Sequence, residues 1–273
     1  MRINIRHDLH FTYEPPARAI IHVLRLNPRG HEGQHVANWR LDVDVDCRTK
    51  MSEDAYGNSV CTFTIDGPVE AINISVEGEI ETFDTAGVVR QAVERFPPEL
   101  FTRESPLAYA DDALRAFASE ATIAGGDTLQ KLHALMGALA KTIAFEPTKT
   151  LDANRQKPGK AFAAEKGDAI DIAHMFVAMA RFLNIPARFI AGYYFVPEAG
   201  TASAHYWAEG FVPGLGWVGF DPAHALCPGE AHVRVACGLD YLDAAPTRFA
   251  NVIGAVESAD MKIKLISAQT QTQ

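Results

Sequence analysis

One segment, residues 167–222, constrains the fold and the chemistry of this chain more than any other. A Gly-Asp pair opens an apolar run that ends before Pro186, which predicts a helix over about 169–183. Three strands are predicted to follow, over about 187–196, 203–212 and 216–220. The segment thus places the start of a buried helix shortly before a set of neighbouring strands.

The strands of this segment carry a histidine and an aspartate. His205 lies on the second predicted strand, and Asp221 ends the third. A reactive residue at a helix start, a histidine and an aspartate form a set of nucleophile, base and orienter. The positive end of the helix dipole would lower the pKa of a thiol there. The helix-start position holds Ala169, however, and a methyl group cannot attack a carbonyl.

The composition excludes some classes of partner. The chain has 273 residues and a net charge of -9, and it has no run of basic residues, which argues against a nucleic-acid or anionic-membrane surface. The N-terminus shows no signal-peptide pattern, and no apolar stretch reaches the roughly 20 residues that span a bilayer, so we expect a cytoplasmic protein. Its scattered cysteines are expected to be reduced thiols: Cys47, Cys61, Cys227 and Cys237.

The chain before residue 167 has two characters. Residues 1–85 alternate apolar and polar positions between turn signals at Pro15-Pro16 and Gly67-Pro68, which predicts a β-sandwich or barrel. Helices are then predicted over about 88–96, 111–121 and 127–143. Residues 147–160 are polar and predict a loop that could flank a cleft.

Four blocks in residues 167–222 resemble the transglutaminase-like superfamily, specifically its bacterial cysteine-peptidase-like branch. Its pattern is G-V-C-Q-D-x-A-H, I-P-A-R-x-x-x-G-Y, H-A-W-x-E and G-W-x-x-F-D-P. The matching residues are Gly167, Asp171, Ala173 and His174; Ile185 to Arg188, Gly192 and Tyr193; His205, Trp207 and Glu209; Gly216, Trp217, Phe220, Asp221 and Pro222. The flanking sequence also resembles the family, so nearly the whole chain is covered.

The resemblance implies an α+β fold, with a β-rich N-terminal domain followed by a papain-like, transglutaminase-like core. We assign residues 1–85 to the β domain, 86–160 to a helical connector and the start of the core, and 161–273 to the core with C-terminal strands. The resemblance also implies a chemistry: a thiol attacks a peptide or glutaminyl amide, and water or an amine then resolves the acyl-enzyme. It implies no cofactor.

The resemblance carries over to individual site residues. His205 would be the general base and acid, Asp221 its orienter, and Ala169 occupies the nucleophile position, where the family has cysteine. The residues expected to contact a peptide or protein substrate are Asp168, Ile170, Trp207 and Glu209. Because the sulfur is absent, we expect this hydrolase-like chain to be inactive. Asp168 and Ile170 also replace the family's Val and Gln, which favours natural loss over a deliberate single replacement.

Two other functions remain open. The cleft could be vestigial in a non-enzymatic binding or scaffold module. Alternatively, a metal-dependent hydrolase could use His205, Asp221, His224 and Cys227, with His232 nearby. Their spacing matches no compact zinc motif, so no metal is expected.

Some polar residues of the segment have structural explanations. A histidine such as His174, inside a buried helix, is more often a satisfied core residue than a site residue. Arg188 is expected in a structural ion pair. Glu209 could line the cleft or be the partner of Arg188.

Overall fold

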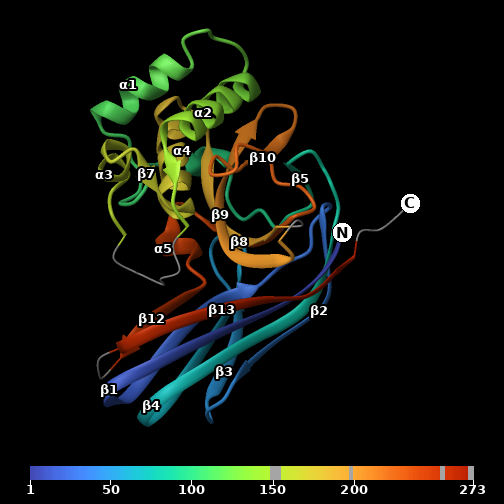
Figure 1. Cartoon of the computed structure of the whole chain (residues 1–273), viewed down its shortest axis with the longest axis vertical. Coiled ribbons are helices and arrows are strands. Elements are labelled where there is room, and N and C mark those ends of the chain that lie inside the picture. The colour runs from blue at the N-terminus through green and yellow to red at the C-terminus, as the bar shows by residue number, and fades with distance from the viewer. Residues whose placement is uncertain (148–154, 197–198, 253–255, 270–273) are drawn as a thin grey trace.

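The computed structural model of the chain describes residues 1–147, 155–196, 199–252 and 256–269. A domain of long β-strands lies at one end of the molecule, and a core with helices lies at the other (Figure 1). Among the described residues, the helices are all too short or too polar to cross a membrane.

The β domain is one antiparallel sheet of six strands. They are β1 (Arg2–Asn27), β2 (Gln34–Val43), β3 (Arg48–Glu53), β4 (Ser59–Thr82), β12 (Thr247–Val252) and β13 (Val256–Gln269). The sheet has the order β12-β1-β4-β2, with β13 also on β1 and β3 also on β4. The first half of β1 pairs with β13 and the second half with β12.

The long strands β1 and β4 run through the two predicted turns. The predictions that Pro15-Pro16 and Gly67-Pro68 end strands are wrong, because both strands continue across these sites. The strands bend there instead, and their pairing register shifts between Thr12 and Ala19. The rings of Phe11 and His22, in opposite halves of β1, lie 5.1 Å apart. The sheet therefore folds over itself around one apolar cluster that contains side chains from both halves.

The C-terminal strands differ from the prediction that placed them in the core. Both β12 and β13 pair with β1, so the end of the chain completes the N-terminal sheet. Alternating apolar residues identify these segments as strands, but the pattern does not say which sheet edge they pair with.

A second antiparallel sheet forms the core. Its order is β11-β8-β9-β10-β5, and its strands are β5 (Val88–Val89), β8 (Ala187–Val196), β9 (Thr201–Val212), β10 (Gly216–Phe220) and β11 (His232–Gly238). The strands predicted after the helix are confirmed. The helix predicted over 88–96 is wrong, because Val88 and Val89 form the edge strand β5, which pairs with β10, and the chain then continues without regular structure. Two β-branched residues favour such an edge pairing.

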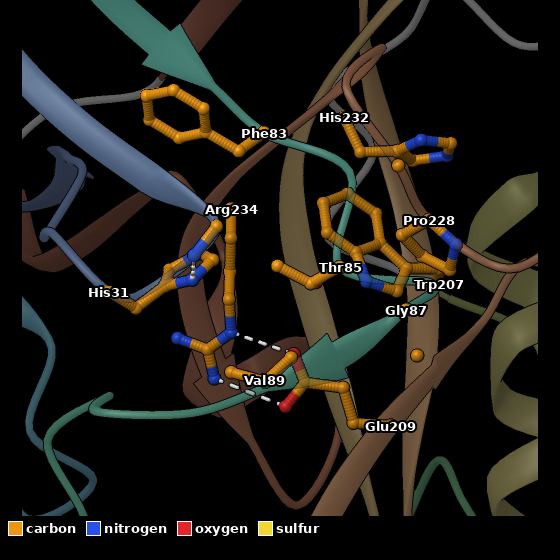
Figure 2. Close-up of a pocket in the computed structure, with 13 residues that line it drawn as sticks. His31, Phe83, Thr85, Gly87, Val89, Trp207, Glu209, Pro228, His232 and Arg234 are labelled. Carbon is orange, nitrogen blue, oxygen red and sulfur yellow. Dashed lines mark hydrogen bonds and ion pairs between the residues drawn. The ribbon is translucent and has the colours of Figure 1, made fainter.

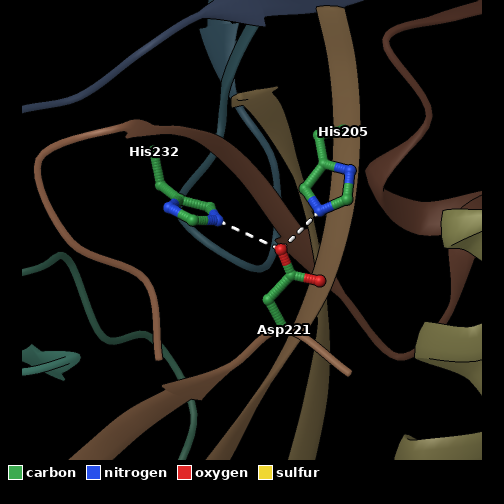
Figure 3. A group of neighbouring side chains, drawn as sticks. All are labelled: His205, Asp221 and His232. Carbon is green, nitrogen blue, oxygen red and sulfur yellow. Dashed lines mark hydrogen bonds and ion pairs between the residues drawn. The ribbon is translucent and has the colours of Figure 1, made fainter. Parts of the chain in front are cut away.

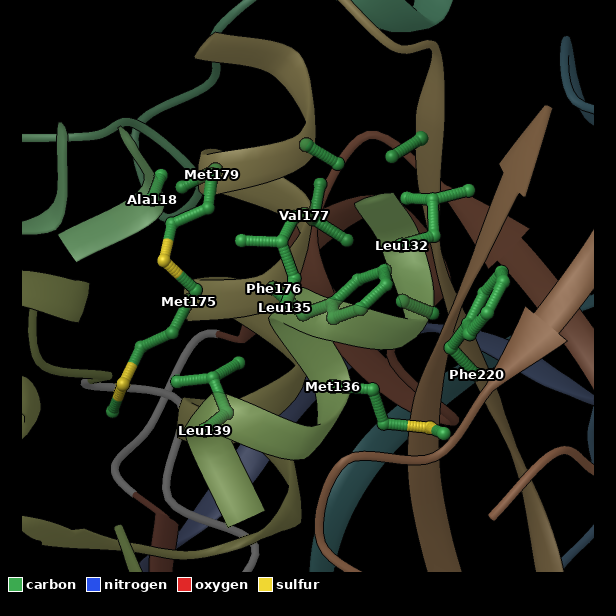
Figure 4. Close-up of a cluster of buried hydrophobic side chains, with 14 of the residues drawn as sticks. Ala118, Leu132, Leu135, Met136, Leu139, Met175, Phe176, Val177, Met179 and Phe220 are labelled. Atoms are coloured by element: carbon green, nitrogen blue, oxygen red, sulfur yellow. The ribbon is translucent and has the colours of Figure 1, made fainter. Parts of the chain in front are cut away.

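Helix α4 (Ala169–Phe182) is the centre of this core, and every residue from Ala169 to Arg181 is buried. Its apolar side chains interlock with those of α2 (Thr128–Thr142) and with Phe220 (Figure 4). The other helices are η1 (Pro98–Thr102), α1 (Asp112–Ala121), α3 (Pro158–Ala163) and α5 (Tyr241–Ala244), and a short parallel pair is formed by β6 (Ala144–Phe145) and β7 (Lys166–Gly167).

The helices predicted over 111–121, 127–143 and 169–183 are confirmed. A capping box between Asp127 and Gln130 starts α2. Of the predicted loop over 147–160, residues 148–154 lie outside the described residues. The remainder contains the start of α3, which sequence analysis missed.

Candidate active site

The start of α4 is built as a capped helix N-terminus. Asp168 is the capping residue, and its Oδ1 accepts hydrogen bonds from the backbone N–H groups of Ile170 and Asp171, both at 2.9 Å. Ala169 is the first residue of the helix and is 7% exposed. The predicted nucleophile position therefore does lie at a helix N-terminus, where a thiol would be activated, but it carries a methyl group.

Side chains from the preceding segment cover this helix start. Nη1 of Arg155 lies 2.6 Å from Oδ2 of Asp168, and both side chains are 9% exposed. The guanidinium of Arg155 also lies 5.1 Å from the ring centre of Tyr241. Nε2 of Gln156 donates to Oδ2 of Asp171 at 3.0 Å. Asp168 thus caps the helix and binds an arginine, and sequence reasoning did not foresee Arg155 as its partner.

The apolar surroundings of Ala169 place it beside the predicted dyad. Ala169 and Ile170 belong to one buried cluster with Tyr206, and Ala204 and Ala223 pack against it. Tyr206 and Ala204 flank His205 in the chain, and Ala223 follows Asp221 by two residues. Helix α4 therefore begins next to the strands that carry the dyad. Ile170, a predicted substrate contact, is 1% exposed and packs within this cluster.

His205 and Asp221 form the predicted pair. Nε2 of His205, on β9, lies 2.7 Å from Oδ2 of Asp221, which directly follows β10, and both residues are buried. Burial alone would raise the pKa of Asp221, but hydrogen bonds from three histidines outweigh it and hold that pKa well below its usual range. The aspartate is therefore a carboxylate that accepts the Nε2–H of His205, which leaves Nδ1 of that ring for another partner.

Two further histidines contact the same carboxylate oxygen. Nδ1 of His224 lies 2.8 Å and Nε2 of His232 lies 3.1 Å from Oδ2 of Asp221. Figure 3 shows His205 and His232 on either side of this oxygen. The ring of Tyr194 packs against all three imidazoles, with centre distances of 4.4 to 5.5 Å. The sequence showed these histidines close together in the chain, but not that they share one acceptor.

Trp207 and Glu209 lie on the same face of β9 as His205. The Trp207 ring is 2% exposed, stacks on His205 at 6.1 Å and meets His232 edge-on at 5.3 Å. Trp207 and Glu209 both line a small pocket of about 40 Å³ next to Arg234 (Figure 2). Trp207, a predicted substrate contact, is therefore a wall of this pocket and packs against the histidines of the dyad region.

Glu209 is held between two arginines. Its carboxylate oxygens lie 2.6 Å from Nε of Arg188 and 2.7 Å from Nε of Arg234, and the residue is fully buried. Burial would raise the pKa of Glu209, but the two guanidinium charges outweigh it and lower that pKa to about 2. The predicted ion pair with Arg188 is confirmed. Since both oxygens are engaged, the structure gives Glu209 a structural role rather than a contact to substrate.

The remaining candidates of this segment are structural. His174 is 1% exposed and its Nε2 accepts the backbone N–H of Tyr241 at 3.0 Å, so it is a core histidine, although its buried Nδ1 has no hydrogen-bond partner among the described residues. Cys227, the nearest cysteine to Asp221 in the chain, packs against the apolar core around α4. Burial raises the pKa of the Cys227 thiol, so it lacks the activation that a nucleophile needs.

Comparison with known proteins identifies the family of both parts of the chain. Residues 3–81 match the bacterial transglutaminase-like N-terminal region, and residues 115–222 match the transglutaminase-like superfamily. The chain therefore belongs to the transglutaminase-like superfamily and carries the N-terminal region of its bacterial members. The fold class and the family expected from the residues are confirmed.

Individual relatives are distant in sequence. A Cytophaga hutchinsonii protein, described as a candidate cysteine protease, shares the fold with a TM-score of 0.76 at 18% identity, over 99% of this chain and 92% of that chain. The uncharacterised protein ML0607 of Mycobacterium leprae is 24% identical over 270 residues, which covers 90% of this chain and 92% of that protein. The periplasmic domain of TgpA from Pseudomonas aeruginosa, at 16% identity over 80% of this chain and 87% of that chain, reaches a TM-score of only 0.40.

Proposed function

We propose that this chain binds peptide or protein amide groups in a transglutaminase-like cleft without forming an acyl-enzyme at position 169. The observation that carries the proposal is the combination of Ala169 at the start of α4 with an intact pair of His205 and Asp221. Covalent catalysis by thiol acyl transfer needs a cysteine sulfur at the helix start. Binding of an amide needs only hydrogen-bond donors and acceptors, and these are retained.

The helix start supplies a donor for a ligand carbonyl. The first N–H groups of a helix have no acceptor within the helix. The side chain of Asp168 accepts hydrogen bonds from the N–H groups of Ile170 and Asp171. The N–H of Ala169 is not bonded to Asp168 and would donate to a carbonyl oxygen of the ligand. Nδ1 of His205, the ring nitrogen that is not bonded to Asp221, supplies a second polar contact, and burial strengthens both contacts because little water competes.

Restoring the sulfur tests whether the rest of the site is competent. We expect Ala169→Cys to react with iodoacetamide faster than the native cysteines do, because the helix start lowers the pKa of the new thiol. We also expect it to release product from a blocked glutaminyl-glycine dipeptide, with hydroxylamine as the acyl acceptor. The wild-type chain is the background for the four native cysteines, and Ala169→Ser is the control without a thiol.

The dyad is tested in the same background. Adding His205→Gln to Ala169→Cys should lower the turnover by about 100-fold or more, because general-base catalysis contributes about that much. For the wild-type chain, the same dipeptide should bind, and Ala169→Trp, which fills the site, should abolish that binding. A folded Ala169→Cys variant without enhanced thiol reactivity, together with a wild-type chain that binds no amide, would refute the proposal.

A further inference from the structure

Four side chains form what we call the histidine–aspartate cluster: His205, His224, His232 and Asp221. Three imidazole nitrogens, from β9, from the turn after β10 and from the start of β11, all lie within 3.1 Å of Oδ2 of Asp221. A carboxylate oxygen offers about two lone-pair directions. Orienting one general base requires a single such bond. The cluster therefore holds more nitrogen ligands than a catalytic pair uses.

The cluster has the composition and spacing of a metal site. The ligand atoms of His205, His232 and Asp221 all lie within 4.8 Å of one another. All three residues are at most 6% exposed. Two imidazoles and one carboxylate are a common ligand set for zinc and other divalent transition metals, which prefer nitrogen together with one or two oxygen ligands.

The surroundings supply outer-shell hydrogen bonds to the carboxylate ligand, whereas the buried Nδ1 of His232 has no hydrogen-bond partner among the described residues. His224 donates to Oδ2 of Asp221 at 2.8 Å, and the backbone N–H of Ala223 donates to its Oδ1 at 3.1 Å. Hydrogen bonds of this kind orient a ligating carboxylate. The rings of Tyr194 and Trp207 pack against the imidazoles and limit the access of water.

The loss of the sulfur removes the conflict between metal binding and catalysis. A metal on Nε2 of His205 would displace its hydrogen bond to Asp221, and with it the orientation that a base beside a thiol requires. With Ala169 at the helix start, no proton transfer from a thiol depends on His205. The same imidazole is therefore free to act as a ligand.

We propose that Nε2 of His205, Nε2 of His232 and the carboxylate of Asp221 bind one divalent transition-metal ion of the zinc type. His224 orients the carboxylate from outside the ligand set. This set differs from the one considered from sequence in two ways. His224 is no longer a ligand, and His232 takes the place of Cys227, whose side chain packs against the apolar core around α4. The metal site shares His205 with the proposed amide site, because the ring would bind the metal through Nε2 and meet an amide through Nδ1.

The test is a metal titration of the purified full-length chain after treatment with a chelator. Wild type should take up about one equivalent of zinc, and cobalt should give the visible absorption of a low-symmetry site. We expect His232→Gln to weaken binding by about 100-fold or more, and His224→Gln, in the outer shell, by about 10- to 100-fold without changing the cobalt spectrum. His35→Gln, at an exposed histidine of β2, should bind as wild type does.

Two results would overturn the site. One is a wild-type chain that binds less than about half an equivalent at roughly 10 µM free zinc, a result that does not depend on the folding of any variant. The other is a folded His232→Gln variant that binds as tightly as wild type. Circular dichroism of each metal-free variant establishes which variants are folded.

Discussion

At the residue scale, buried histidines make the stability of this protein depend on pH. His174 accepts the N–H of Tyr241 through Nε2, so protonation of that nitrogen would break the bond. Burial, with the nearby charges of Arg155 and Arg181, lowers the pKa of His174 to about 3. An unfolded histidine titrates near 6.5, so the unfolded state takes up the proton first as the pH falls. The stability that neutral His174 provides is complete above about pH 6.5 and is lost toward pH 3.

His174→Gln should therefore flatten the pH dependence of stability. Urea unfolding between about pH 6 and pH 4 should give a slope smaller than that of wild type by about 1.4 kcal/mol per pH unit, the contribution of one group. The wild-type slope also contains other buried histidines, since burial lowers the pKa of His7 to about 4 and that of His22 to about 3. The exposed His35→Gln is the matched control. An unchanged slope in His174→Gln would show that this histidine is not the titrating group.

The contacts of individual residues were predictable only where they are local. The pair of His205 and Asp221 could be expected because both lie on consecutive strands joined by a short turn. The alternation of side chains along β9 likewise made Arg188 and Glu209 plausible partners. The bonds of His232 to Asp221 and of Arg234 to Glu209 depend on β11 pairing with β8, which no local pattern specifies.

At the element scale, the bend shared by β1 and β4 depends on one glycine. A Cβ added at Gly67 would lie 2.0 Å from the carbonyl oxygen of Ala17 and 2.8 Å from Cα of Arg18. Both neighbours are backbone atoms, so the strands themselves would have to move. We expect Gly67→Ala to lower the free energy of unfolding by about 1–3 kcal/mol or more, as overpacking typically does.

Gly137 in α2 provides the opposite control. A Cβ there would meet nothing within 4 Å, and the position lies inside a regular helix. Gly137→Ala should raise the free energy of unfolding by about 0.5–1 kcal/mol, because alanine favours a helix. Chemical denaturation measures both changes. Equal effects of the two substitutions on the free energy of unfolding would show that the backbone atoms near Gly67 do not exclude a Cβ there.

The elements with complete local signals were the predictable ones. Helix α2 has its capping box, and α4 has an N-cap at Asp168 and an apolar run that stops before Pro186. The prolines at 15, 16 and 68 were interpreted as strand ends because a proline has no N–H to donate. Strands that bend together can accommodate prolines at such a site, and that outcome depends on a partner strand far away in the sequence.

At the scale of the whole molecule, two amide side chains join the β domain to the core. Asn58, at the end of the turn before β4, accepts the N–H of Cys237 at 2.8 Å and donates to its carbonyl at 2.7 Å, so it pairs with β11 as a strand residue would. Gln34 makes the same two bonds to Arg234, both at 2.8 Å. Strand β11 also carries His232, so these amides fix one side of the histidine–aspartate cluster. The β domain thus helps to shape the site.

Because of these bonds, we expect the two domains to unfold as one unit, and Asn58→Ala to weaken both. The substitution leaves the buried N–H and C=O of Cys237 without partners, each at a cost of about 1–3 kcal/mol. For wild type, urea unfolding curves followed by tryptophan fluorescence and by far-ultraviolet circular dichroism should coincide. Asn58→Ala should unfold at a lower urea concentration, and its free energy of unfolding should be lower by about 2 kcal/mol or more. Asn38→Ala, at an exposed asparagine of β2, should change stability by less than about 0.5 kcal/mol. Separate transitions for wild type would mean that the domains are independent and that the bonds of Asn58 do not couple them.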